Sequence, residues 1–150
     1  MRGDAIEQEA EAEFELLGGG EMIPLCRDQG VGLIPYSPLA RGFLSGARTR
    51  DGGARSRRAD SDPVRQELYG RDEDSGVIDA LSELGRERGL PPAQIALAWL
   101  LHKPGVTAPI IGATRSTYID DAIAATRVSL TRDELGRLEA PYRPHAPIEQ

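Results

Sequence analysis

Apolar positions along the 150-residue chain alternate between helical spacing and short, wholly apolar runs. Residues 21–29 have apolar side chains at helical spacing, and Gly30 suits a helix C-cap. Residues 31–35 form a short apolar run, which is typical of a strand buried on both faces of a parallel sheet. Residues 47–76 are rich in Arg, Asp, Gly and Ser. This composition predicts a long loop with at most one turn.

Helical spacing returns further along the chain. Residues 77–88 are apolar on one face, and Gly89 ends the predicted helix. Two prolines, Pro91 and Pro92, open the next helix, which spans residues 93–102. That helix is apolar nearly all round, so we expect it to be buried on more than one side.

The last part of the chain repeats the strand and helix patterns. Residues 106–111 are a second short apolar run, followed by a predicted helix over 116–125 with Ser116 as its N-cap and with Ile119 and Ile123 facing inward. A final helix over 132–140 begins at a capping box. That box is formed by Thr131 and Glu134. The proline-rich tail after it predicts an extended segment.

Two strands separated by helices indicate parallel pairing through crossover connections. Two strands alone do not make a stable sheet, and the apolar helix needs more cover than they provide. The pattern therefore predicts the α/β class and part of an α/β barrel. Both strands run into segments of small and polar residues, and parallel α/β proteins bind nucleotide cofactors at such strand ends.

Composition excludes several classes of function. The net charge is −6, from 18 Lys and Arg against 24 Asp and Glu, which argues against a nucleic-acid partner. The single cysteine, Cys26, excludes an internal disulfide framework, and the two histidines are too scattered for a zinc site. No apolar run is long enough to span a membrane. Residues 1–20 form an acidic segment with few structure signals, so they lack the positively charged start of a signal peptide. We therefore expect a soluble cytoplasmic protein.

Four stretches of this sequence resemble the aldo-keto reductase family. Residues 31–44 (VGLIPYSPLARGFL) resemble the seventh-strand motif, and residues 93–101 (AQIALAWLL) the helix before the eighth strand. Residues 109–115 (PIIGATR) resemble the eighth strand with its cofactor loop. Residues 138–145 (LEAPYRPH) are similar to the ending of a bacterial branch of the family. Four motifs in unbroken order make the resemblance strong.

The resemblance implies a partial (β/α)8 TIM barrel in which residues 21–150 are the C-terminal half, with strands seven and eight and their helices. The family uses NADPH to reduce aldehydes and ketones to alcohols. Its catalytic set is an Asp, a Tyr, a Lys and a His from the first half of the barrel, and no segment of this chain matches their motifs. Lys103 is interpreted as part of a helix end, like His102, and His145 as a tail residue.

The first strand end carries the nicotinamide and pyrophosphate contacts that the resemblance implies. The ring of Tyr36 would stack on the nicotinamide, since an aromatic face suits a flat heterocycle; the alternative is a core tyrosine. The segment from Ser37 through Leu39 to Gly42 would wrap the pyrophosphate, with Arg41 pairing a phosphate oxygen. The alternative there is a plain turn.

The second strand end would hold the 2′-phosphate of NADPH at the start of a helix, where amides and the helix dipole attract anions. Arg115 is the natural clamp in this interpretation, and Tyr118 could stack on the adenine while Asp121 accepts from its amino group. The alternative is a solvated helix start. The remaining residues assigned to this loop are Gly112, Ala113, Thr114 and Ser116.

Three functions stay open for the isolated chain: a reductase half completed by a missing half, a truncated non-catalytic remnant, and a nucleotide-binding regulatory module. A small carbonyl substrate is expected only for the completed barrel. Unpaired strand edges and an apolar patch beside the two strands predict association, either with itself or with a complementing chain.

Overall fold

The computed structural model describes residues 22–46 and 75–142, so the expectations for residues 1–20, for most of the 47–76 loop and for the tail after residue 142 lie outside it. The described part is mainly helical. Its helices are α2 (Met22–Asp28), the 3-10 helix η1 (Ala40–Ser45), α4 (Ser75–Arg88), α5 (Pro92–Leu101), α6 (Ser116–Ala125) and α7 (Arg132–Glu139).

Local signals set the ends of these helices. Gly30 and Gly89 have φ of 65° and 64°, the left-handed conformation that glycine adopts without steric cost, and each stops the helix before it. α5 begins with Pro92 in its first turn, as predicted. At α7 the backbone N–H of Glu134 donates to the Thr131 hydroxyl, and the Glu134 carboxylate accepts from the Thr131 N–H, which confirms the capping box.

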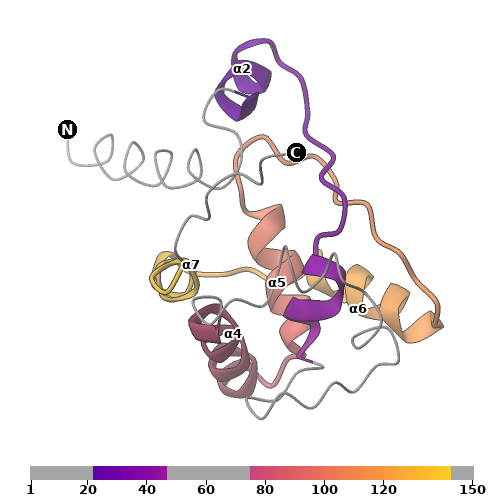
Figure 1. Cartoon of the computed structure of the whole chain (residues 1–150), viewed down its shortest axis with the longest axis vertical. Coiled ribbons are helices and arrows are strands. Elements are labelled where there is room, and N and C mark those ends of the chain that lie inside the picture. Colours follow the sequence, from indigo (N-terminus) through magenta and orange to yellow (C-terminus); the bar gives the residue numbers. More distant parts are fainter. Residues whose placement is uncertain (1–21, 47–74, 143–150) are drawn as a thin grey trace, which may run out of the picture.

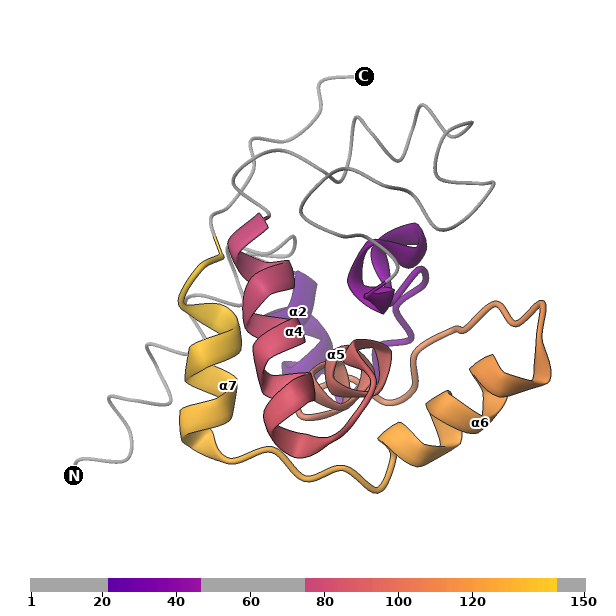
Figure 2. The same ribbon diagram turned by 90° about the horizontal axis from the view of Figure 1, so that it is seen from below.

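Helix α5 lies at the centre of the described structure, with α4 and α7 on one side and α6 on the other (Figures 1 and 2). η1 packs against α4 and α5. Six consecutive residues of α5, Ala93 to Ala98, are buried, which confirms the expectation drawn from its all-round apolar character. We call α4, α5 and α7 the helical layer.

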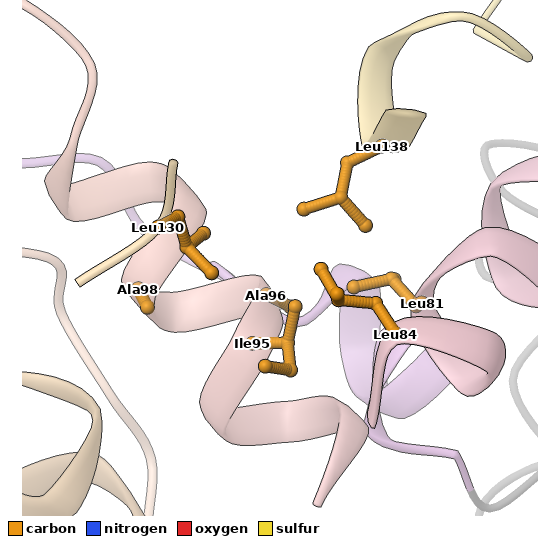
Figure 3. Close-up of a cluster of buried hydrophobic side chains, with 7 residues drawn as sticks. All are labelled: Leu81, Leu84, Ile95, Ala96, Ala98, Leu130 and Leu138. Carbon is orange, nitrogen blue, oxygen red and sulfur yellow. The ribbon is translucent and has the colours of Figure 1, made fainter. Parts of the chain in front are cut away.

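A compact apolar core holds the helical layer together. Leu81 and Leu84 of α4 meet α5 residues and Leu138 of α7, and Leu130 closes one side (Figure 3). Leu84 and Ile95 are the largest fully buried side chains among the described residues, at 1% and 0% exposure. Burying each contributes roughly 1.5–3 kcal/mol relative to exposure.

The two predicted strands pair in parallel, as expected, but only through isolated bridges. Leu33 pairs with Val106, and Tyr36 pairs with Ile110. The N–H of Leu33 donates to the Gly105 carbonyl at 2.9 Å, and the N–H of Thr107 donates to the Leu33 carbonyl at 2.8 Å. We call residues 31–36 and 106–111 the paired segments.

Prolines explain why the pairing stays short. The second segment holds one more residue between the two bridges than the first, which is the count of a β-bulge. Pro35 and Pro109 have no N–H to donate, so a continuous ladder cannot form across them. At Gly32, a Cβ would lie 2.0 Å from the Thr107 hydroxyl oxygen, so a larger residue there would require the Thr107 side chain or the segments to shift.

The expected burial of the paired segments is wrong for their apolar side chains. Val31 and Ile34 are 55% and 60% exposed, and Ile110 and Ile111 are 55% and 39% exposed. Each segment has only the other beside it, so the described residues leave these side chains uncovered.

The same error affects α6. Ile119 and Ile123, expected to face inward, are 47% and 52% exposed, and the one buried residue of this helix is Ala125. The helix lies against α5 through its other face. Among the described residues, no helix is long and apolar enough to cross a lipid bilayer.

Candidate functional site

Parallel pairing brings the two predicted strand ends to one place. The bridge between Tyr36 and Ile110 comes last along both segments, and the Ile110 N–H donates to the Pro35 carbonyl at 2.8 Å. Beyond this bridge the chain continues as residues 37–42 on one side and 111–115 on the other. We call these the first loop and the second loop.

The first loop has an unusual backbone. Ser37, Ala40 and Arg41 have φ of 52°, 47° and 53°, and Gly42 has φ of 87°. Such conformations cost free energy in residues with a Cβ and gather at binding sites and turns. Two turn hydrogen bonds support them, from the Ala40 N–H to the Ser37 carbonyl at 2.9 Å and from the Gly42 N–H to the Leu39 carbonyl at 2.8 Å.

Side chains at the first loop divide into anchors and exposed groups. Phe43 is buried, and Leu39 and Leu44 pack against the core of the helical layer. Leu39 therefore fixes the loop through its side chain, and its carbonyl accepts hydrogen bonds from the N–H groups of Gly42 and Leu44. The ring of Tyr36 is 80% exposed, so the alternative of a core tyrosine is wrong for the described structure.

The second loop leads into α6 with an exposed helix start. Arg115 is the N-cap, in an extended conformation, and Ser116 is the first helical residue. The expectation that Ser116 is the N-cap is therefore wrong by one position. The Arg115 side chain makes no capping hydrogen bond, and the first turn carries no acidic residue. The N-cap side chain thus leaves the orphan amides of this turn uncapped, and the turn brings no carboxylate of its own.

Beyond the first turn of α6, the candidate residues differ in their surroundings. Tyr118 is 46% exposed, which leaves its ring accessible. Asp121 is turned toward α5, where its Oδ1 accepts a hydrogen bond from Nε2 of Gln94 at 2.8 Å. One oxygen of this carboxylate is therefore already engaged within the chain. Gln94 was not singled out from the sequence.

The residues near the end of α5 have structural partners. The Leu130 N–H donates to Nε2 of His102 at 3.3 Å, so Nδ1 carries the proton and donates to the Ala98 carbonyl at 2.7 Å. Lys103 forms an ion pair with Glu139 and lies 4.6 Å from the centre of the Trp99 ring. These contacts agree with the interpretation of Lys103 and His102 as helix-end residues.

Ion pairs join α4 and α7, away from the two loops. Arg137 donates to both carboxylate oxygens of Glu87, at 2.8 and 2.7 Å, and this contact lowers the pKa of Glu87. The pKa of Glu134 is lowered mainly by the hydrogen bond from the Thr131 backbone. In the described ranges, no three His, Cys, Asp or Glu side chains gather where they could hold a metal ion.

Comparison with known proteins assigns this arrangement to a family. A model of the Aldo/keto reductase family matches residues 14–143. The versiconal hemiacetal acetate reductase of Aspergillus parasiticus is 39% identical over 130 residues, which cover 84% of this chain and 36% of that protein. A Glycine max protein named Probable aldo-keto reductase 1 is 33% identical over 115 residues, which cover 77% of this chain and 33% of that protein.

A solved structure agrees with the fold. The crystal structure of a thermostable aldo-keto reductase in complex with the inhibitor epalrestat has a TM-score of 0.53 and 24% identity to this chain. The match covers 81% of this chain and 33% of the other. The chain thus spans about a third of the length of the relatives that it matches.

Proposed function

Because this chain belongs to the aldo/keto reductase family, we propose that it supplies the NADP(H)-binding part of a carbonyl reductase. Members of this family generally use NAD(P)H, which when bound provides the hydride that reduces an aldehyde or ketone to an alcohol. In this proposal the paired segments are strands seven and eight of a (β/α)8 barrel. The catalytic groups come from the part of the barrel that precedes them.

The observation that carries the proposal is the bridge between Tyr36 and Ile110. It places the exposed Tyr36 ring, the first loop and the second loop at one edge of the paired segments. A dinucleotide has a flat ring at one end and a phosphate-bearing adenosine at the other. Its binding site therefore needs two binding surfaces side by side, as the two loops provide. Ligands of parallel α/β folds bind at the carboxyl ends of the strands, and both loops follow the carboxyl ends of the paired segments.

The first loop fits the pyrophosphate and the nicotinamide. Tyr36 offers an exposed aromatic face for stacking. The left-handed conformations of Arg41 and Gly42 make a tight turn, and the missing side chain of Gly42 lets the backbone approach an anion closely. Ser37 adds a hydroxyl to this loop, and Arg41 adds a cation.

The second loop fits the phosphate on the adenosine. Arg115 stands at the N-cap of α6, and the amides of the first turn lie behind it. Both attract an anion, the guanidinium through paired hydrogen bonds and the helix end through its dipole. The hydroxyls of Thr114 and Ser116 flank this position, and Gly112 and Ala113 allow close approach of the backbone.

The exposed side chains of the paired segments favour a partner. Val31, Ile34 and Ile110 are each more than half exposed, on segments whose outer edges lack a strand beside them in the described structure. We propose that the rest of an aldo/keto reductase barrel covers them, either in a longer chain or in a complementing one. Without that cover, we expect the 150-residue chain to associate with itself.

A titration with NADPH tests the proposed function. Trp99 is a poor reporter, because it hydrogen-bonds to Glu139 of α7 on the side of α5 opposite α6 (Figure 2). The fluorescence of the nicotinamide itself, or the heat of binding, reports the site directly. We expect saturable binding of NADPH that weakens when Arg115→Ala is introduced.

Matched variants make this titration specific. Arg127→Ala removes an exposed arginine just after the other end of α6 and should leave the affinity unchanged. NADH should bind more weakly than NADPH if Arg115 pairs with the 2′-phosphate. Absence of binding at millimolar NADPH would contradict the proposal. Carbonyl-dependent oxidation of NADPH by the 150-residue chain alone would contradict the statement that the catalytic groups come from elsewhere.

A further inference from the structure

We propose that Gln94 is a positioning residue that sets the orientation of the first turn of α6 through its hydrogen bond to Asp121. The inference rests on the proposed function, because that first turn is where the phosphate of the adenosine would bind. It gives Asp121 a different task from direct recognition of adenine.

Gln94 stands out by its burial. It is 9% exposed and is the one buried polar side chain in the described part of the chain. Its neighbours along α5, Ala93 and the residues from Ile95 to Ala98, are apolar and equally buried. A buried amide without a partner is costly, whereas an apolar side chain of the same size would pack there without that cost. A polar residue at this position therefore indicates a purpose for its hydrogen bond.

The partner of Gln94 explains that purpose. Nε2 of Gln94 donates to Oδ1 of Asp121 at 2.8 Å, across the boundary between α5 and α6. An amide that donates to an ionised carboxylate forms a charge-assisted bond, which is stronger and more directional than a bond between neutral groups. The contact thus fixes the rotation of α6 about its own axis.

Among the described residues, the front of α6 is little buried. Ala125, its last residue, is its one buried residue, and residues 116–120 are all exposed. Ser116 lies roughly 13 Å along the helix axis from Ala125, at 1.5 Å per residue. A tilt of roughly 10° about Ala125 would therefore move the first turn by about 2 Å, more than the roughly 0.5 Å that a preorganised site tolerates. The hydrogen bond at Asp121 restricts this tilt, because Asp121 lies about halfway along the helix.

Two fragments of the cofactor separate positioning from overall stability. Adenosine 2′,5′-bisphosphate carries the adenosine and its phosphate, and nicotinamide mononucleotide carries the other half. We expect Gln94→Met, which keeps the length of the side chain, to weaken binding of the bisphosphate about tenfold. Binding of the mononucleotide should stay unchanged, because Tyr36 and the first loop do not depend on α6.

Gln29→Met is the matched control. Gln29 also donates to a carboxylate, that of Asp28 at 2.6 Å, but this pair is exposed and lies at the end of α2. The control should leave the affinity for both fragments unchanged. Amide hydrogen exchange should become faster in α6 and stay the same in α4 for Gln94→Met alone.

A second variant keeps the inference open to failure. Asp121→Ala, at a partly exposed position, should weaken bisphosphate binding as much as Gln94→Met does, and the double variant should be no weaker than either. If Asp121→Ala weakens bisphosphate binding but Gln94→Met does not, Asp121 contacts the ligand directly and the inference is wrong. If Gln94→Met abolished binding of both fragments, the variant would have lost its structure in general, and the inference would also be wrong. If the wild-type chain binds neither fragment, the proposed function fails, and this inference fails with it.

Discussion

The helical layer and the paired segments both carry large apolar side chains, but these side chains end in opposite states. In the layer, Leu84 and Ile95 are 1% and 0% exposed. In the segments, Ile34 and Ile110 are 60% and 55% exposed. The layer buries its apolar residues with helices that this chain supplies itself, whereas in the described structure each segment has only the other segment paired with it.

The difference teaches where stability and function are separated in this chain. The helical layer forms a core that holds η1, and through η1 the first loop. The paired segments carry both candidate walls of the cofactor site on a framework that their own neighbours do not complete. An exposed isoleucine forgoes roughly 1.5–3 kcal/mol of the stabilisation that burial would bring. A covering partner would therefore stabilise the very elements that bear the site.

The largest expected effect comes from replacing one isoleucine by alanine in each region. Ile95→Ala should lower the free energy of unfolding by about 2–5 kcal/mol, since it leaves a cavity in the core. Ile34→Ala should lower it by less than about 0.5 kcal/mol in the isolated chain, because the side chain is already exposed. Urea unfolding of both variants measures the difference. Equal losses would mean that Ile34 is covered in solution, which would remove the contrast between the regions.

A second variant tests whether the paired segments hold together as the structure shows. Gly32→Ala would place a Cβ 2.0 Å from the Thr107 hydroxyl oxygen, so the Thr107 side chain or the segments must shift. We expect a loss of about 1–3 kcal/mol in unfolding free energy. Adding Thr107→Ala removes that oxygen and should restore most of the loss. Gly112→Ala, with no atom within 4 Å of its new Cβ, is the control, and an equal loss there would contradict the close approach.

The start of α7 provides a smaller effect that depends on pH. Thr131→Ala removes the capping box and should cost about 1 kcal/mol at neutral pH. The pKa of Glu134 in the folded chain lies below its ordinary value of 4.5, chiefly because the Thr131 N–H donates to it. A lowered carboxyl pKa stabilises the fold above the unfolded value, and this contribution disappears as the pH falls through the folded value. The cost of Glu134→Gln should thus shrink below about pH 4.5, and a cost that grew there would contradict this account.

The smallest effect is expected at the exposed pair of Arg137 and Glu87. Both side chains are almost half exposed, at 45% and 46%, so water and salt screen their attraction. Arg137→Met should destabilise the chain less than Ile95→Ala, Gly32→Ala or Thr131→Ala, and its effect should vanish at high salt. Urea unfolding at low and high salt measures this. A salt-independent loss would indicate that packing of the arginine stem, and not the charge pair, joins α4 and α7.

Sequence reasoning succeeded where the interaction is local. The capping box of Thr131 and Glu134 spans three residues, and the glycines that end α2 and α4 act within one turn, so their signals stand in the sequence itself. The parallel direction of the paired segments also followed from the order of the elements.

Sequence reasoning failed where the outcome depends on distant parts of the chain. Helical spacing showed that Ile119 and Ile123 share a face, but not that this face turns away from α5. An apolar run such as residues 31–35 indicates a strand that needs cover, without indicating whether cover is present. The bond between Gln94 and Asp121 joins positions 27 residues apart, and its only local signal is a lone amide in an apolar helix.

The central claim is that the two loops form one cofactor site across the paired segments. Amide hydrogen exchange of the 150-residue chain, with and without NADPH, tests it most directly at Leu33, Thr107 and Ile110, whose N–H groups join the segments. One ligand that spans both loops should slow exchange at all three amides together and leave Leu84 in the helical layer unchanged. Slower exchange on one segment only, or on neither, would contradict the claim.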